Sequence, residues 1–326
     1  MATIDMSSYT DTQDALDNVT RDTTNGDVFE YPDGWTETTT GNLDFSLYGN
    51  PTALAPLEFK GLGANTITLG GVWIYQNDYI ILNNLNIEST TYGIIGSANA
   101  SSYVLCKDCT FEVTGSQTAI AYDKGHVKFV RCHLKGGSTR AFRNGPHWLY
   151  DCVLDDVYNF ANGTYLHYYN CLFINDARAT GERVDCYRCT FVGSTWGIYS
   201  DNFSAHDCVF KDCGYGVIGI NSSTRGLEGV LRNNIFYGST SADTLFNAPL
   251  IDEDNEYNAA SDPVPNSGTG DYTTADVLDN YQDRGSLGDG SASYTGGNNG
   301  RGAILSYPTS GGGIQIARGM HGGMRG

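Results

Sequence analysis

Hydrophobic and polar positions alternate along this chain in a short unit that recurs. The unit reads apolar, any, polar or charged, usually Cys, any, large apolar. It occurs as LNNLNI (82–87), CKDCTF (106–111), FVRCHL (129–134), LYDCVL (149–154), YYNCLF (168–173), CYRCTF (186–191), AHDCVF (205–210) and LRNNIF (231–236). Successive fourth positions lie 24, 23, 20, 19, 18, 19 and 26 residues apart. Such a period predicts a solenoid in which each unit belongs to one coil.

The alternation also assigns a direction to each position. Because side chains alternate along a strand, the fourth and sixth positions of the unit share a face. The sixth position is always large and apolar, which marks that face as the core: it is Ile87, Phe111, Leu134, Leu154, Phe173, Phe191, Phe210 and Phe236. Coils about 4.8 Å apart would stack like on like. We therefore expect an internal ladder of reduced cysteines beside a ladder of phenylalanines.

A second row marks the next side of each coil and has a small residue followed by an apolar one. Its members are Gly93-Ile94, Ala119-Ile120, Ala141-Phe142, Gly197-Ile198 and Gly216-Val217. Both rows recur in phase, as a coil with several sides requires.

The third position of the unit should lie at a bend and face outward. It is occupied by Asn84, Asp108, Arg131, Asp151, Asn170, Arg188, Asp207 and Asn233. Opposite charges follow one another in Asp108–Arg131–Asp151 and in Arg188–Asp207, which predicts a ladder of ion pairs between coils. Such a ladder would penalise slips of register, because a slip brings like charges together.

The N-terminal segment has the pattern of a cap. Thr10 and Gln13 fit a capping box, and Ala15, Leu16 and Val19 lie on one helical face. The stretches NGDVFEYPDGWTE (25–37) and APLEFKGLGA (55–64) predict the strands and turns of a first coil.

This order of a short helix, a Gly-Asp strand with a Pro-x-Gly turn, and a PLEFKG strand resembles the pectin-lyase-like superfamily over about residues 10–250. The resemblance implies an all-β fold, a right-handed parallel β-helix solenoid with an N-terminal capping helix and an irregular C-terminal extension. The corresponding boundaries are 1–24 for the arm and capping helix, 25–250 for the β-helix, and 251–326 for the extension. The resemblance carries little about activity, because this fold hosts many chemistries.

The extension is acidic over 252–289 and ends in the glycine-rich, mildly basic GGGIQIARGMHGGMRG (311–326). NNGRGAI (298–304) resembles a closing motif of phage and bacterial β-helix chains. Arg318, His321 and Arg325 are the predicted assembly residues, docking on the acidic body of a neighbouring copy in a homo-oligomer such as a trimer. The alternative is that the tail folds back on its own chain.

Composition narrows the possible functions. A formal net charge of −18 over 326 residues argues against a nucleic-acid-binding body. The sequence contains neither a run of about 18 apolar residues, which a membrane helix would need, nor a secretory signal at its start, so we expect assembly in a cytoplasm. The nine cysteines include two CxxC pairs, Cys106/Cys109 and Cys186/Cys189, which would suit zinc or redox chemistry, but the repeat accounts for them better. We expect no metal and no cofactor.

Candidate chemistry centres on the outward position four residues before the cysteine. This candidate face comprises Lys128, Trp148, His167 and Asp185, with Glu182, Asp155 and Asp156 expected nearby. An aromatic side chain beside an acid and a base could bind a glycan, and Asp185, His167, Asp155 and Glu182 would be the catalytic set of a glycosidase. The family's hydrolase motifs are missing, since Val127 follows Gly125-His126 where the family has glycine. A solvated solenoid face is the favoured interpretation.

Remaining ring residues have structural interpretations. His147 falls in an inward row with Val104, Val127 and Val184, which predicts a core histidine, and Tyr150, Tyr169 and Tyr187 predict a stacked tyrosine row. The sequence therefore favours a non-enzymatic structural protein of a virus particle, such as a bacteriophage capsid decoration, with other virion proteins as partners. The alternatives are a phage tailspike-type polysaccharide depolymerase and a self-assembling bacterial surface or filament protein.

Overall fold

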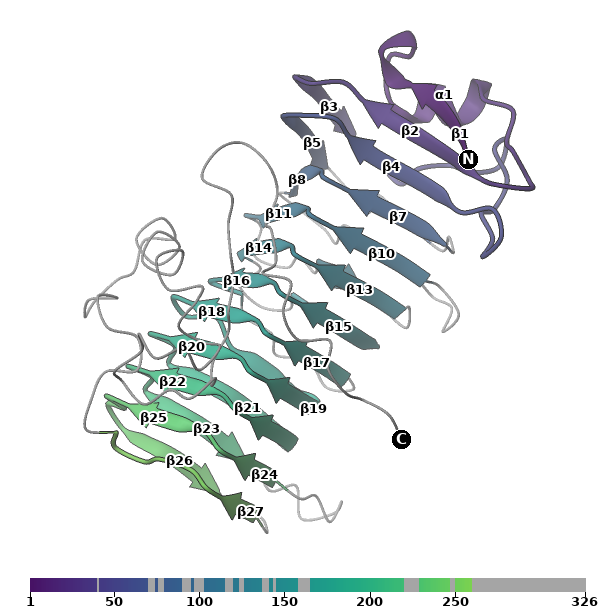
Figure 1. Ribbon diagram of the computed structural model, residues 1–326. Coiled ribbons are helices and arrows are strands. Elements are labelled where there is room, and N and C mark those ends of the chain that lie inside the picture. The colour runs from purple at the N-terminus through teal and green to yellow at the C-terminus, as the bar shows by residue number, and fades with distance from the viewer. Residues whose placement is uncertain are drawn as a thin grey trace, which may run out of the picture.

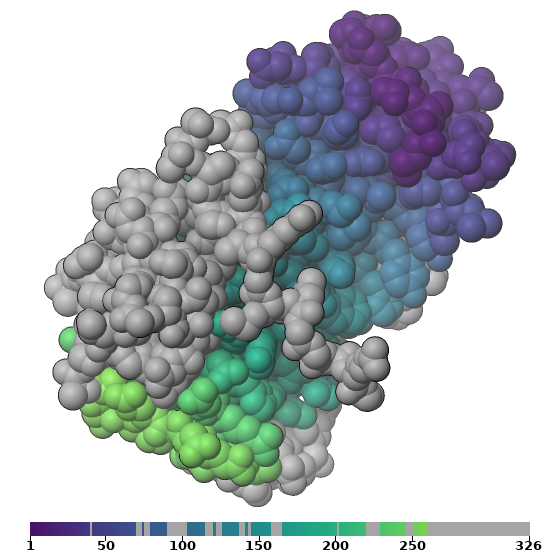
Figure 2. All heavy atoms as spheres, viewed as in Figure 1, coloured from purple at the N-terminus to yellow at the C-terminus, as the bar shows by residue number. Residues whose placement is uncertain are grey.

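The computed structural model describes residues 1–39, 41–69, 74–75, 79–89, 95–96, 103–114, 120–122, 126–136, 141–142, 145–157, 165–219, 229–246 and 250–259. These residues form a parallel β-solenoid, as the repeat predicts, with the N-terminal coil at one end and the last coils, in green, at the other (Figures 1 and 2). Among these residues α1 (Thr12–Asn18) is the only α-helix, and a 3-10 turn, η1 (Met6–Ser8), precedes it.

The strands of the described residues lie in three parallel sheets. Sheet A has 14 strands: β1 (Ala2–Asp5), β2 (Asp27–Tyr31), β4 (Leu57–Gly61), β7 (Ile80–Asn83), β10 (Tyr103–Lys107), β13 (His126–Val130), β15 (Pro146–Tyr150), β17 (Tyr165–Tyr169), β19 (Ala179–Tyr187), β21 (Trp196–His206), β23 (Tyr215–Gly219), β24 (Gly229–Arg232), β26 (Ala242–Phe246) and β27 (Leu250–Glu253). Sheet B has 10 strands: β3 (Trp35–Thr39), β5 (Asn65–Leu69), β8 (Asn86–Ser89), β11 (Thr110–Val113), β14 (His133–Gly136), β16 (Val153–Asp155), β18 (Leu172–Ile174), β20 (Thr190–Val192), β22 (Val209–Lys211) and β25 (Ile235–Tyr237). Sheet C has three: β6 (Ile74–Tyr75), β9 (Ile95–Gly96) and β12 (Ala121–Tyr122).

Strands β19 and β21 are long enough to turn a corner of the coil. Their first residues pair Ala179 with Ile198, and their last pair Tyr187 with His206. The first part of β21 then pairs with β23 and the second part with β24. Gly197-Ile198 and Gly216-Val217 of the predicted small-apolar row lie on this further side, where Ile198 pairs with Val217. Gly93, Ile94 and Ala119 lie outside the described residues.

The bend between sheets A and B is made by the predicted row. All eight residues before the fourth position have φ between 53° and 55°, namely Asn84, Asp108, Arg131, Asp151, Asn170, Arg188, Asp207 and Asn233. Asn and Asp tolerate this left-handed conformation through local hydrogen bonds, whereas arginine is unusual there.

A second bend, which the sequence analysis does not anticipate, ends sheet B. Six residues with φ between 51° and 78° mark the ends of strands of sheet B: Gly136 is the last residue of β14, and Asp156, Asn175, Gly193, Asp212 and Gly238 each follow a strand. Gly, Asn and Asp are the residues for which this conformation costs least. The signal was present in the sequence as a Gly/Asn/Asp row two residues after the phenylalanine row.

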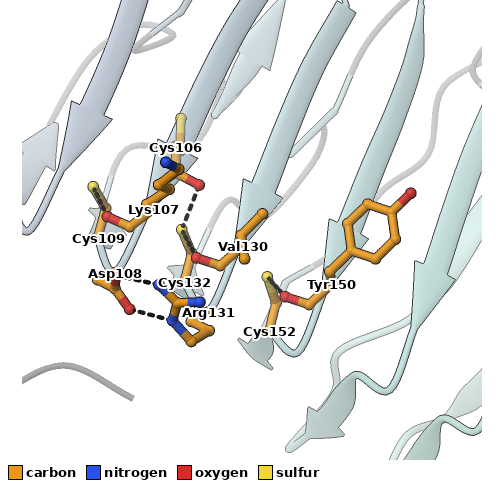
Figure 3. Close-up of polar contacts among 9 residues, drawn as sticks. All are labelled: Cys106, Lys107, Asp108, Cys109, Val130, Arg131, Cys132, Tyr150 and Cys152. Carbon is orange, nitrogen blue, oxygen red and sulfur yellow. Dashed lines mark hydrogen bonds and ion pairs between the residues drawn. The ribbon is translucent and has the colours of Figure 1, made fainter. Parts of the chain in front are cut away.

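The core contains the two predicted ladders. Buried Cys109, Cys132, Cys152, Cys171, Cys189 and Cys208 follow one another from coil to coil, and all nine cysteines are free. Each thiol of this six-residue row donates to a backbone carbonyl near the bend. Cys132 Sγ, for instance, lies 3.5 Å from Val130 O and 3.6 Å from Cys106 O (Figure 3). In the neighbouring row Phe173, Phe191, Phe210 and Phe236 stack with centroids 4.2 to 4.8 Å apart.

The N-terminal cap differs in detail from the prediction. Asp11 is the N-cap residue and accepts from Asp14 N at 2.8 Å, while Gln13 contacts Asp17 and Asp44 instead of closing a capping box with Thr10. An aspartate one residue later offers a charged acceptor to the same first turn, which explains why it displaces the threonine. Ala15 and Leu16 are buried over the first coil as predicted.

The pairing extends beyond the predicted solenoid boundaries at both ends. β1 pairs with β2 inside the segment assigned to the arm, and β27 pairs with β24 as far as Glu253. Asn255 then occupies the row of the cysteines, where its Oδ1 accepts from Asn234 N at 2.8 Å. Asparagines thus take over from cysteines at this end of the ladder.

Candidate functional site

A continuous row of rings lies on the outer face of sheet A and includes two residues of the predicted candidate face. Tyr79, Tyr103, His126, Trp148 and His167 stack in that order, with successive centroids 5.5, 5.1, 5.6 and 5.6 Å apart. The angles between successive rings are 21°, 10°, 13° and 9°, so the rings are nearly parallel. We call these five residues the outer ring ladder.

The three inner rings of the outer ring ladder, Tyr103, His126 and Trp148, are stacked on both faces and offer only their edges to the solvent. Both faces of Trp148 are occupied, one by His126 and the other by His167. A sugar ring that stacks on an aromatic side chain needs an open face. The predicted glycan platform at Trp148 is therefore already filled by protein side chains.

The ladder ends at a carboxylate with two partners. His167 Nδ1 lies 3.0 Å from Asp185 Oδ2, and Arg183 Nε lies 3.2 Å from the same oxygen. Partial burial raises the pKa of Asp185, but the hydrogen bond from His167 and the charge of Arg183 outweigh it and hold that pKa below its usual value. These contacts favour the ionised carboxylate of Asp185, which suits a base or a nucleophile better than a general acid.

Lys128, the remaining residue of the candidate face, does not contact the outer ring ladder's rings through stacking but lies over a tyrosine. Its Nζ lies 4.6 Å from the ring centroid of Tyr150, a cation–π geometry. Tyr150 in turn stacks on Tyr169 at 5.0 Å and 6°, which confirms that part of the predicted tyrosine row. Lys128, Trp148, His167 and Asp185 do lie in neighbouring strands in register, as predicted.

The structure does not bring Asp155 to this face. Asp155 is buried at the end of β16 in sheet B, where it accepts from Asn175 Nδ2 at 2.5 Å and lies 4.0 Å from His133 Nε2. The left-handed bend at Asp151 turns the chain between β15 and β16 and so separates Asp155 from the outer face of sheet A. The expectation that Asp155 lies near Asp185 is wrong for this reason, and Asp156 at the next bend lies in the same part of the coil.

Glu182 and Asp185 belong to one strand, β19, but are three residues apart. β19 turns the corner between them, where Glu182 is partly exposed beside the exposed Arg183. Asp155, in sheet B, does not face Asp185 as the second carboxyl group that glycoside hydrolysis requires.

Two predictions about cysteine and histidine concern the interior. His147 is fully buried and lies against Phe142 at 5.7 Å, which confirms a core position. Burial raises the pKa of the Cys109, Cys152 and Cys171 thiols well above the usual value, and that of Cys213 to about 12. A nucleophilic cysteine needs a lowered pKa and access, which these residues lack.

A recess lies at the bend of the first coils. Its lining includes Trp35, Asn65, Asn84 and Asp108, and its volume is about 490 Å³. The amides of Asn65 and Asn84 are engaged between coils, donating to Asn84 O and Gly61 O, both at 2.9 Å. Its polar groups serve the stacking of coils.

Tyr103 and His126 were missed by the sequence analysis, although both lie on the face of the predicted residues. Tyr103 and His126 pair in register in β10 and β13, two residues before the row of Lys128. The alternation of the strand was the available signal. The assembly residues Arg318, His321 and Arg325 lie outside the described residues.

Within the described ranges, His, Cys, Asp and Glu side chains nowhere gather in a group of three that could hold a metal ion. The helix found in those ranges is too short and too polar to cross a membrane. No family model matches the chain, and no similar protein was found among curated proteins or solved structures. The fold defines the chain as a parallel β-solenoid protein, and its function must be argued from its own residues.

Proposed function

We propose that this chain is a non-enzymatic structural protein of a virus particle, a capsid decoration or another virion component. One observation supports the proposal: the side chains of the candidate face already contact other side chains of the protein. Trp148 and His167 stack within the outer ring ladder, Asp185 pairs with His167 and Arg183, and Lys128 covers Tyr150.

Stiffness is the property that these contacts produce. Inside, thiols and phenyl rings repeat from coil to coil, and outside, rings and bend residues do the same. Ten strands of sheet B at about 4.8 Å spacing give a rod roughly 43 Å long. A rod of this kind suits a component that must keep its shape on the outside of a particle.

The charge of the chain supports an assembly partner. The net charge of −18 keeps free copies apart, whereas Arg318, His321 and Arg325 offer positive charge at the C-terminal end. A basic tail and an acidic body are complementary, so a neighbouring copy or another virion protein with an acidic surface is the expected partner.

A depolymerase of the tailspike type is the less favoured function. Its cleavage step needs two carboxyl groups about 5 to 9.5 Å apart, one of them protonated. Of the predicted catalytic set, His167 and Asp185 stand at the end of the outer ring ladder, Asp155 lies in sheet B, and the pKa of Asp185 is lowered.

One observation favours the third function, a self-assembling surface or filament protein. Leu245 in β26 and Ile251 in β27 are 48% and 38% exposed at the C-terminal end of the solenoid. Each strand has one paired neighbour among the described residues, so apolar side chains accompany an open sheet edge. Contact with a further protein at this end would cover both.

Immunogold electron microscopy of particles from the native source, with an antibody to residues 25–250, tests the proposal. Label over an icosahedral shell is the expected result. Label confined to a tail tip would favour the depolymerase, and its follow-up is polysaccharide cleavage by the wild type against Asp185→Asn. Label on cells or filaments without particles would overturn the virion assignment in favour of the third function.

A further inference from the structure

The outer face of sheet B changes character half way along the solenoid. In β8 and β11 exposure alternates, with Ile87 and Phe111 buried and Asn86 and Thr110 partly exposed. In β16, β18, β20 and β22 all three residues of every strand are buried. A strand buried on both faces has something packed on each of them.

The residues on this second face are mostly apolar. They point away from the interior because they alternate with Leu154, Phe173, Phe191 and Phe210, which fill it. We call the following residues the outer apolar face: Val153, Leu172, Ile174, Thr190, Val192, Val209 and Ile235, each no more than 1% exposed. The main core cluster of the described residues includes none of these seven residues. Val209 and Ile235 form a small cluster of their own, and the other five belong to no hydrophobic cluster of the described residues.

The charged groups of the same surface, Lys211 and Asp155, each have polar or aromatic partners. Lys211 is 1% exposed, with Nζ 3.9 Å from Asp212 Oδ2 and 5.9 Å from the centroid of the Tyr237 ring. Asp155 accepts from Asn175 at 2.5 Å. An apolar segment that covers this face would therefore not bury a charge without a partner.

These exposures belong to the chain by itself, without a second copy or another protein. The described part of the chain ends on this face: Ala259 packs against Val209 and Ile235, and its N–H donates to Phe236 O at 2.8 Å. Beyond Ala259 the sequence continues for 67 residues, 326 minus 259.

We propose that residues 303–307, Ala-Ile-Leu-Ser-Tyr, dock on the outer apolar face of their own chain. This stretch holds three consecutive apolar residues and a tyrosine, the most apolar run of the chain after Ala259. The face spans four coil steps from Ile235 to Val153, roughly 19 Å. The 43 residues between Ala259 and Ala303 can cross that distance several times over.

The docking of 303–307 has a consequence for the rest of the extension. It would hold the start of the glycine-rich end near the body and leave Arg318, His321 and Arg325 free to meet a partner. The inference does not rest on the virion assignment, since a filament protein or an enzyme would need the same cover.

Photo-crosslinking in the full-length chain tests the docking. Benzoylphenylalanine replaces Leu305, and the matched control carries it at Ile314, which lies beyond the apolar run. After irradiation at low protein concentration, the expected product is a monomer with Leu305 joined to peptides of β16, β18, β20 or β22. Crosslinks between chains would show that a second copy covers the face, and crosslinks elsewhere, or none, would also overturn the proposal.

A second measurement uses hydrogen exchange of the 300–307 peptide in the full-length chain. Leu172→Asp should speed its exchange at least about tenfold, because the carboxylate disrupts the docking surface. Thr110→Asp places the same charge at the equivalent outward position of β11 and should leave the peptide unchanged. Unchanged exchange in a folded Leu172→Asp variant would refute docking, with protection of the β20 peptide reporting that the solenoid is intact.

Discussion

Arg131 lies one coil after Asp108 and donates to both of its carboxylate oxygens, with Nε–Oδ1 and Nη2–Oδ2 distances of 2.6 Å (Figure 3). The arginine makes this bidentate pair from a backbone with φ of 53°. The same relation, an acid on one coil and a donor on the next, links Asp151 to Asn170 at 2.6 Å and Asp207 to Asn233 at 2.5 Å. The predicted ion-pair ladder is thus confirmed at Asp108–Arg131, while Asp151 and Asp207 use amides.

The bend position sets the first prediction. Arg131→Asn should change the free energy of unfolding by less than about 1 kcal/mol, because asparagine tolerates φ above zero and can donate to Asp108 as Asn170 donates to Asp151. Arg131→Val should cost about 2 kcal/mol or more, since a β-branched residue is strained there and lacks the donor. Urea denaturation measures both. Equal stability of the two variants would contradict the role of the bend.

A second prediction concerns the small residues of the third side. A Cβ at Gly216 would lie 2.6 Å from Asp243 O and 2.6 Å from Phe236 Cδ1, so Gly216→Ala should lower the free energy of unfolding by about 1–3 kcal/mol. Gly41→Ala is the control, because nothing lies within 4 Å of a Cβ there, and it should stay within about 0.5 kcal/mol of the wild type. A neutral Gly216→Ala in thermal denaturation would show that the third side is looser than described.

The thiols give a third prediction. Under native conditions at neutral pH the nine cysteines should resist a thiol reagent, because all nine are buried and a reagent cannot reach them. In guanidinium chloride all nine should titrate as free thiols. Quantitative labelling with and without denaturant is the measurement. A stoichiometric disulfide count in the denatured protein would refute the reduced ladder.

The fourth prediction is a pH dependence centred on His133. Burial lowers the pKa of His133, against the attraction of Asp155, so the unfolded chain binds the proton more readily than the folded one. Stability should therefore fall as the pH drops from 7 to 5, through the unfolded histidine range of about 6.5. His133→Gln should flatten this slope, and the remainder should come from His206, whose pKa burial also lowers. An unchanged slope in His133→Gln would contradict the assignment.

Most of the solenoid could be predicted from the sequence, because each coil needs the same kind of residue at its core positions and at its bend. The phenylalanine row and the cysteine row were predicted to face inward, and both are buried. The bend row was predicted from the same register, and its eight members share φ values within 2° of one another. Period-2 alternation combined with a repeat of about 20 residues leaves little freedom for another arrangement.

The candidate site was predictable only in part. The register of Lys128, Trp148, His167 and Asp185 followed from their common distance to the cysteine. The position of Asp155 did not follow from the sequence. It depends on the direction in which the chain turns at Asp151, which places Asp155 in sheet B beside Asn175.

The sequence by itself determined the coil, because backbone alternation and burial of the sixth position hold wherever the unit recurs. Only the tertiary structure decided what the outward residues do. Whether Trp148 offers a face or an edge depends on the rings of the coils before and after it, and whether Val209 is exposed depends on chain far from it in sequence. Both properties depend on contacts between segments that are distant in sequence. A local sequence pattern does not specify which segment will pack on an outward position.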